Sequence, residues 1–160
     1  SLPAGSVISL LSKNYPNVSL DTWRTDWSSG TLTELNIDGD AMKKYEGLGF
    51  VGINFEGAKA IDASAMTYLH LDVWTPDLET FRVKLVDFGA AGAWGNGDDT
   101  EFELSFNATS TPALTGTSQW VSLDIPLSSF SGMNRSHLAQ MILSIPTGTG
   151  TVFLDNVYFH

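Results

Sequence analysis

The sequence predicts an all-β protein, a sandwich of two stacked antiparallel sheets connected as a jelly roll. Short segments of alternating apolar and polar residues recur along the chain, and turn residues separate them. Only 16% of the residues are charged, while Gly, Ser, Thr and aromatic residues are abundant, a balance typical of strands and turns. Because the chain has neither an internal repeat nor βαβ alternation, its roughly nine strands are expected to form two layers.

The strand predictions follow the alternation in chain order. Residues 68–74 give the clearest pattern, with Leu69, Leu71 and Val73 on one face. Asp38-Gly39 predicts a hairpin turn between two segments of this kind. One short helix-like stretch is expected at 131–138. The predicted strands are 7–11, 32–37, 41–45, 49–55, 68–74, 81–88, 101–107, 120–125, 139–145 and 151–160.

Composition limits the function classes. A length of 160 residues suits one domain covering 1–160, and the missing initial methionine suggests a piece excised from a larger protein. The formal charge of −10 would repel nucleic acid and other polyanions, so neutral sugars fit better as ligands. The absence of cysteine excludes disulfides and thiolate metal clusters. No apolar run reaches the ~20 residues of a membrane-spanning helix, so we expect no membrane insertion.

Two long loops carry tryptophans and are the first candidate sites. Trp23 and Trp27 lie in the loop 12–30, and Trp94 lies between glycines in GAAGAWGNGDD at 89–99, beside Asp98 and Asp99. Tryptophan offers a flat apolar face to a pyranose ring, and carboxylates accept hydrogen bonds from the hydroxyl groups of the sugar. We therefore predict that at least one of the three rings contacts a glycan. The alternative is that Trp23 or Trp27 plugs one end of the sandwich.

A second candidate site lies on strand faces. Trp74 leaves the core side of its strand together with His70 and Asp72, and the next strand points two cations outward, Arg82 and Lys84. On one concave face these residues would form a binding cleft, whereas on a convex face they would be ordinary solvated surface. Trp120 opens a strand and is expected in the core.

An enzymatic alternative rests on carboxylates. Glu101 and Glu103 share a strand face roughly 6.5 to 7 Å apart, a separation that glycosidases also use, and Asp98 and Asp99 lie close by. Paired carboxylates on an outer face more often serve solvation, and no catalytic motif is present. We therefore predict that the protein is not an enzyme.

Several phrases resemble a known family. They are VISLLSKNYPNVSLDTWRTDW at 7–27, IDASAMTYLHLDVWTP at 61–76, FRVKLVDFG at 81–89, WVSLDIPLSSFSG at 120–132 and TVFLDNVYFH at 151–160. Together they look like the jelly-roll carbohydrate-binding modules attached to bacterial glycoside hydrolases, including modules beside β-1,3-glucanases. The resemblance implies a secreted or cell-surface module, monomeric and without catalysis. It would bind a polysaccharide or oligosaccharide, such as laminarin or another β-glucan, for an attached catalytic domain.

The resemblance also implies a structural calcium ion. Asp155 resembles the aspartate that holds such an ion in the last strand of related modules, and the first loop could add Asp21 or backbone carbonyls. Asp155 as a simple turn or surface residue is the alternative. A third functional class, a structural or surface-interaction sandwich without a glycan ligand, also remains open.

Overall fold

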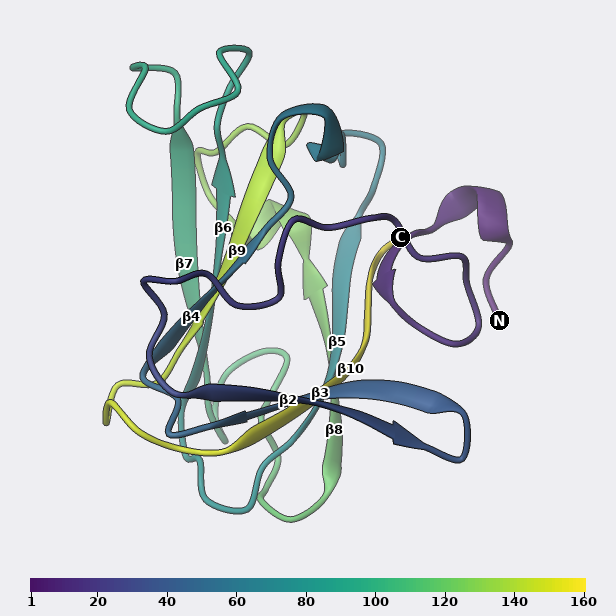
Figure 1. The fold of residues 1–160 in the computed structure, drawn as a ribbon, viewed down its shortest axis with the longest axis vertical. Helices are drawn as coiled ribbons and strands as arrows, with labels where there is room; N and C mark the ends of the chain where they lie inside the picture. The colour runs from purple at the N-terminus through teal and green to yellow at the C-terminus, as the bar shows by residue number, and fades with distance from the viewer.

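The computed structural model describes all 160 residues, which form ten strands in two antiparallel sheets (Figure 1). The six-stranded sheet has the order β2 (Thr31–Ile37), β3 (Asp40–Glu46), β10 (Val152–Phe159), β5 (Tyr68–Trp74) and β8 (Trp120–Pro126), and β1 (Ile8–Leu11) also pairs with β10. The four-stranded sheet has the order β4 (Phe50–Asn54), β9 (Leu138–Ser144), β6 (Phe81–Asp87) and β7 (Thr100–Phe106). The predicted all-β sandwich is confirmed.

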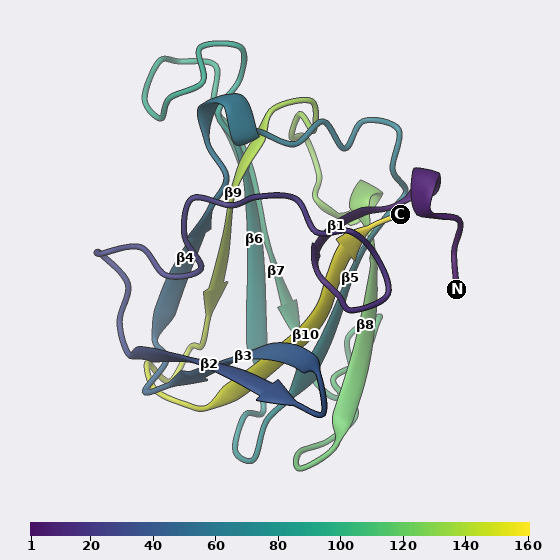
Figure 2. The same ribbon diagram turned by 45° about the vertical axis from the view of Figure 1, so that its right-hand side comes forward.

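The two sheets lie as separate layers (Figure 2). The hydrophobic core is formed by the inward-facing residues of both sheets. In β5 and β8 every second residue is buried, as the alternation predicted, and Leu71 in β5 and Leu85 in β6 are completely buried. The core cluster contains 31 buried residues drawn from both sheets, so a single core holds the layers together. Truncating one of its leucines to alanine is expected to cost about 2 to 5 kcal/mol.

The β2–β3 hairpin forms as predicted. Asp38 and Gly39 both have positive φ values, 53° and 81°, which is the backbone of a two-residue hairpin turn. The side chain of Asn36 reinforces the turn by accepting a hydrogen bond from the Gly39 amide at 2.9 Å. Hairpin pairing continues without a break from Ile37 to Thr31.

The predicted helical stretch at 131–138 is wrong. The chain makes turns there and enters β9 at Leu138. Gly132 has a φ of 71°, outside the right-handed helical region, and the His137 amide donates to the Asp87 carboxylate rather than to a helical carbonyl. The helical segments are three single turns of 3-10 type, Ala4–Ser6, Gly57–Lys59 and Leu127–Ser129. None of them is long enough to cross a membrane.

The expectation that Trp120 lies in the core is also wrong, since this residue is 48% exposed. The inner face of β8 is formed by Val121, Leu123 and Ile125, so the strand period places Trp120 on the outer face. The expectation came from the place of Trp120 at the start of a strand, but the alternation of the strand decides the direction of its side chain.

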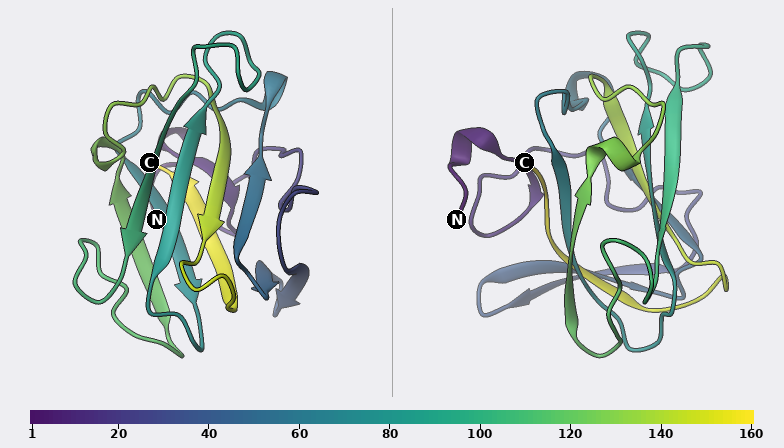
Figure 3. Two further views of the ribbon diagram at one scale, coloured as in Figure 1. Left: turned by 90° about the vertical axis from the view of Figure 1, so that its left-hand side faces the viewer. Right: turned by 180° about the vertical axis from the view of Figure 1, so that it is seen from behind.

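The two tryptophan-bearing loops lie at the border of the four-stranded sheet. The first loop runs along the edge of β4, where Thr22 bridges to Asn54 and the Thr25 amide donates to the Gly52 carbonyl at 3.0 Å. The glycine-rich loop between β6 and β7 projects past one end of this sheet (Figures 1 and 3). The outer face of the four-stranded sheet therefore has a tryptophan-bearing loop at its edge and another at its end.

Candidate functional site

The outer face of the four-stranded sheet carries a cleft of about 510 Å³, within the range of small-molecule sites. Its floor comes from neighbouring strands, because outward-pointing residues of β4, β9, β6 and β7 lie next to one another across the sheet. The lining residues are Trp27, Asn54, Glu56, Lys84, Phe88, Trp94, Glu101, Gln140 and Ile142. Three of the predicted residues, Trp27, Lys84 and Trp94, are thus brought together.

Trp27 forms one side of the cleft. Its side chain comes from the first loop, is 48% exposed and stacks on Phe50 of β4, with ring centroids 6.2 Å apart and an angle of 21° between the planes. The edge of the ring lies directly over Gly52, which has no side chain to push it away. Because half of this large apolar ring stays in water, it offers a surface to a ligand.

Trp94 forms another side of the cleft from the glycine-rich loop. It is 60% exposed, and its ring leans on Phe88 with centroids 6.1 Å apart. The carboxylates of Asp98 and Asp99 shape this loop, since they accept hydrogen bonds from the amides of Ala91 at 3.1 Å and Gly95 at 2.6 Å. Neither aspartate lines the cleft, so the structure supports a role in holding the loop that carries Trp94.

Polar groups occupy the cleft between the two tryptophans. The Gln140 amide donates to Asn54 Oδ1 at 2.8 Å, and Asn54 Nδ2 donates to Glu56 at 3.2 Å. Lys84 Nζ and the Glu101 carboxylate form an ion pair at 3.2 Å. Such a row of amides, carboxylate and ammonium presents both donors and acceptors to a ligand that has many hydroxyl groups.

Arg82 lies two residues before Lys84 on the same face of β6, outside the lining of the cleft. It pairs with Glu103 at 3.9 Å and donates to Ser105 at 3.2 Å. Glu101 and Glu103, the carboxylates of the enzymatic alternative, are therefore each opposed by a cation of β6. No observation on this face favours an acid and nucleophile pair.

Trp23 does not belong to the cleft. Its ring is partly buried against the core, and Lys43 Nζ lies 5.1 Å from the ring centroid. Its carbonyl accepts a hydrogen bond at 2.7 Å from Tyr45, a fully buried tyrosine of β3. Trp23 therefore lies outside the cleft for which it was proposed, and its contacts fit the alternative that it plugs one end of the sandwich. Burial raises the pKa of Tyr45 far above its ordinary value, so its hydroxyl stays protonated and can donate.

Trp74 does not join Arg82 and Lys84, contrary to the predicted strand-face cleft. β5 belongs to the six-stranded sheet and β6 to the four-stranded sheet, so their outer faces look in opposite directions. Trp74 instead packs edge-on against Phe153 with centroids 5.4 Å apart and lies directly across from Trp120. It lines an apolar groove of about 350 Å³ on that side.

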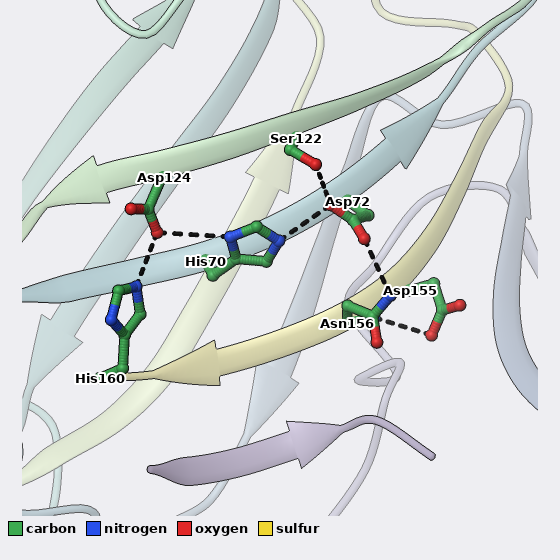
Figure 4. A network of polar contacts seen from close by, with 7 residues as sticks. All are labelled: His70, Asp72, Ser122, Asp124, Asp155, Asn156 and His160. Carbon is green, nitrogen blue, oxygen red and sulfur yellow. Dashed lines mark hydrogen bonds and ion pairs between the residues drawn. The ribbon is translucent and has the colours of Figure 1, made fainter. Parts of the chain in front are cut away.

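Asp72 lies on the same outer face in a network that joins β5, β8 and β10 (Figure 4). It accepts hydrogen bonds from Ser122 at 2.6 Å, Asn156 at 2.8 Å and His70 Nε2 at 2.8 Å. Burial by itself raises its pKa, but these three partners outweigh burial, and the pKa is lowered. Its hydrogen-bonding capacity serves the sheet rather than the cleft.

His70 is held between two carboxylates in this network. Its second ring nitrogen faces Asp124 at 3.3 Å, and His160 approaches the same oxygen at 2.7 Å (Figure 4). Burial lowers the pKa of His70, but the hydrogen bonds and charges of Asp72 and Asp124 outweigh it, so the pKa is raised. Two acceptors on one imidazole favour the doubly protonated ring.

The two residues predicted for calcium lie in different parts of the fold. Asp21 accepts the Glu56 amide and pairs with Lys59 at 3.3 Å beside β4, whereas Asp155 is buried in β10 of the other sheet. Burial, together with the neighbouring charge of Asp40, raises the pKa of Asp155 to about 6. Nowhere do three or more His, Asp or Glu side chains gather as a metal-binding group.

Sequence reasoning missed most of the cleft floor. Gln140 and Ile142 point outward from β9, where the inward residues are Met141 and Leu143. The outward Ile142 was a usable signal, because an apolar residue on the polar side of an alternating strand suggests a covered or functional surface. Phe88, just after β6, gives no such signal, because only tertiary packing reveals its place: it is buried with Val86 and Ala139 in a small cluster, and Trp94 leans on it.

Comparison with known proteins shows what this fold resembles. No protein-family model and no curated protein matches the sequence. Among solved structures, the family 30 carbohydrate-binding module of a cellulosomal cellulase of Clostridium thermocellum superposes with a TM-score of 0.67 at 14% identity, covering 96% of each chain. The family 11 module of the same organism, in complex with a β-1,3-1,4-mixed-linked tetrasaccharide, gives 0.61 at 13% identity, covering 96% of this chain and 94% of that one.

A third structure, a variant of a family 29 carbohydrate-binding module, gives a TM-score of 0.54 at 11% identity over 96% of this chain and 83% of the other. At identities this low, the superpositions establish the architecture of this chain but not its ligand. The ligand has to be inferred from the site itself. This chain has the β-sandwich fold seen in carbohydrate-binding modules of families 30, 11 and 29.

Proposed function

We propose that this protein is a non-catalytic carbohydrate-binding module that holds a neutral polysaccharide in the cleft on its four-stranded sheet. One observation carries the proposal: Trp27 and Trp94, both at least 48% exposed, come from separate loops to the same polar cleft. Exposing two tryptophans costs the folded protein apolar burial, so a ligand that covers them is the simplest physical reason for their position.

The chemistry of the cleft suits a sugar. Pyranose rings are apolar on their faces and polar around their edges, and the cleft places aromatic rings next to amide and charged groups. The ligand should be uncharged, because the protein carries a net charge of −10 and because Lys84 is already paired with Glu101.

A β-glucan, β-1,3-linked or mixed-linked, is the ligand we propose within this class. The family 11 module with the same fold was solved with a β-1,3-1,4-mixed-linked tetrasaccharide. The sequence phrases that resemble modules beside β-1,3-glucanases agree with this choice. On the same grounds we propose a secreted bacterial, monomeric module that targets an attached glycoside hydrolase to its substrate.

Affinity electrophoresis in native gels tests the proposal. Laminarin, mixed-linkage glucan, xylan, mannan and a soluble cellulose derivative would each be cast into a gel, and retardation of the protein would be measured against a non-binding standard. We expect retardation by at least one glucan, and loss of it in Trp27→Ala/Trp94→Ala. Reducing-end release should stay at background. Absence of retardation in every gel would contradict the proposal, and released reducing ends would favour an enzyme.

A structural calcium ion at Asp155 stays a separate prediction. Asp40 Oδ1 is buried without a hydrogen-bond partner, and its charge acts on Asp155, so these two carboxylates could share a cation. Asp21 is not available to them, because it is engaged with Lys59 and the Glu56 amide. Thermal melting with calcium chloride and with chelator tests the pair: calcium should raise the melting temperature of the wild type and leave Asp155→Asn unchanged.

A further inference from the structure

The part of the first loop that carries Trp27 is tied together by one side chain. The guanidinium of Arg24 donates to the carbonyls of Gly30 and Ser28 at 3.0 Å each, and to that of Thr25 at 3.4 Å. A planar guanidinium that reaches three carbonyls fixes their relative positions. The curvature of residues 24–30, and with it the place where Trp27 leaves the loop, therefore depends on Arg24.

The same loop is joined to β4 through Gly52. The Gly52 carbonyl accepts the Thr25 amide at 3.0 Å, and the Gly52 amide donates to Ser28 Oγ at 2.9 Å. Thr25 and Ser28 hydroxyls are also hydrogen-bonded to each other at 2.7 Å, out of contact with solvent. Both main-chain groups of Gly52 thus hold the loop in register with the strand.

Gly52 also leaves the space that the ring of Trp27 occupies. A Cβ atom at this position would lie 2.3 Å from Cη2 and 2.4 Å from Cζ2 of Trp27, distances that packed proteins do not tolerate. The backbone does not require glycine here, since Gly52 is not among the residues with positive φ. Glycine weakens a strand interior, so its presence indicates close approach by another group, here the indole.

We propose that Gly52 is a positioning residue of the carbohydrate site: its missing side chain, with Arg24 fixing the loop, sets the pose of Trp27 in the cleft. The inference rests on the proposed function and adds a residue that does not touch the ligand. With any side chain at position 52, Trp27 must leave β4, and its stacking surface no longer faces the polar floor.

Four proteins test the inference: wild type, Gly52→Ala, Trp27→Ala and the double variant. Calorimetry with mixed-linkage glucan and laminarin gives the affinities, and urea unfolding gives the stabilities. We expect Gly52→Ala to lose about tenfold in affinity, as weakening of one stacked aromatic contact would cause. In the Trp27→Ala background the same change should alter affinity less than about twofold, because the ring it displaces is absent.

Gly150→Ala is the matched control. A Cβ there would lie 2.3 Å from Leu78 and 2.9 Å from Ile145, both buried in the core, and Gly150 has no positive φ and does not line the cleft. This variant should lose stability and keep its affinity within about twofold. An NMR signal reports the position of the Trp27 ring independently of ligand binding. The Trp27 indole N–H resonance, identified by its absence in Trp27→Ala, should shift in Gly52→Ala and not in Gly150→Ala.

Arg24→Gln provides a second route should Gly52→Ala fail to fold, and it should lose affinity only when Trp27 is present. Wild-type affinity in the folded Gly52→Ala or Arg24→Gln variant, or an equal loss when either is added to Trp27→Ala, overturns the inference and leaves the proposed function standing. A wild type that binds no glycan, or a Trp27→Ala variant that binds as tightly as wild type, refutes the cleft itself, and the inference with it.

Discussion

Truncation of Trp94 to alanine tests the cleft directly, because the structure gives this ring little to do in folding. The side chain is 60% exposed, and its ring leans on Phe88 at the end of the sheet. Removing a fully buried tryptophan costs about 3 to 5 kcal/mol. With roughly two fifths of the surface buried, the loss in unfolding free energy should be at most about 1 to 2 kcal/mol.

Trp94→Ala should affect glycan affinity more clearly than it affects stability. A sugar ring stacked on Trp94 should contribute on the order of 1 to 3 kcal/mol, by analogy with other stacked aromatic contacts, which corresponds to roughly a 5- to 150-fold loss in affinity. Isothermal titration calorimetry with the best-binding glucan measures the affinity, and urea unfolding followed by circular dichroism measures the stability.

Trp120→Ala is the control, because Trp120 is 48% exposed but lies on the opposite face of the sandwich. We expect it to lose about 1.5 to 2.5 kcal/mol of stability, half the cost of a buried ring, and to bind as wild type does. The reverse result, with Trp94→Ala binding normally and Trp120→Ala binding weakly, would refute the reasoning. It would move the site to the groove around Trp74.

Three further predictions follow from other parts of the structure. Asp98 does not line the cleft, but Asp98→Ala should still weaken glycan binding several-fold, because it frees the Ala91 amide and loosens the loop that carries Trp94. Calorimetry measures this loss of affinity. In the presence of chelator, the contribution of Asp155 to stability should fall as pH rises from about 4 through 6, because burial raises the pKa of Asp155 to about 6 and folding then favours its protonated form. After discounting for solvent screening this contribution amounts to about 1 to 2 kcal/mol, and Asp155→Asn should flatten this part of the urea-unfolding profile. The contribution of protonated His70 to the free energy of unfolding should be complete below its ordinary pKa of about 6.5 and be lost as pH rises through its raised pKa. His70→Gln should therefore flatten the stability profile above a pH of about 6.5, and an unchanged slope would contradict the charged network.

The sequence by itself determined the strands and the direction of most side chains. In a strand the side-chain period is two residues, so Leu69, Leu71 and Val73 could be placed inside from local pattern alone. The hairpin at Asp38-Gly39 was equally local, because its backbone needs positive φ at two adjacent residues. Trp27 and Trp94 could be proposed as site residues because their polar, glycine-rich surroundings offer no core.

Only the tertiary structure decided which outward-pointing residues share a face. Trp74 and Lys84 come from consecutive strands, yet the chain passes from one sheet to the other between them, and the residues end on opposite sides. Conversely, Asn54, Lys84 and Gln140 are far apart in sequence and meet because β4, β9 and β6 are neighbours. Strand direction follows from local backbone geometry, whereas strand neighbours depend on long-range pairing and the packing of the whole core, which a local pattern does not contain.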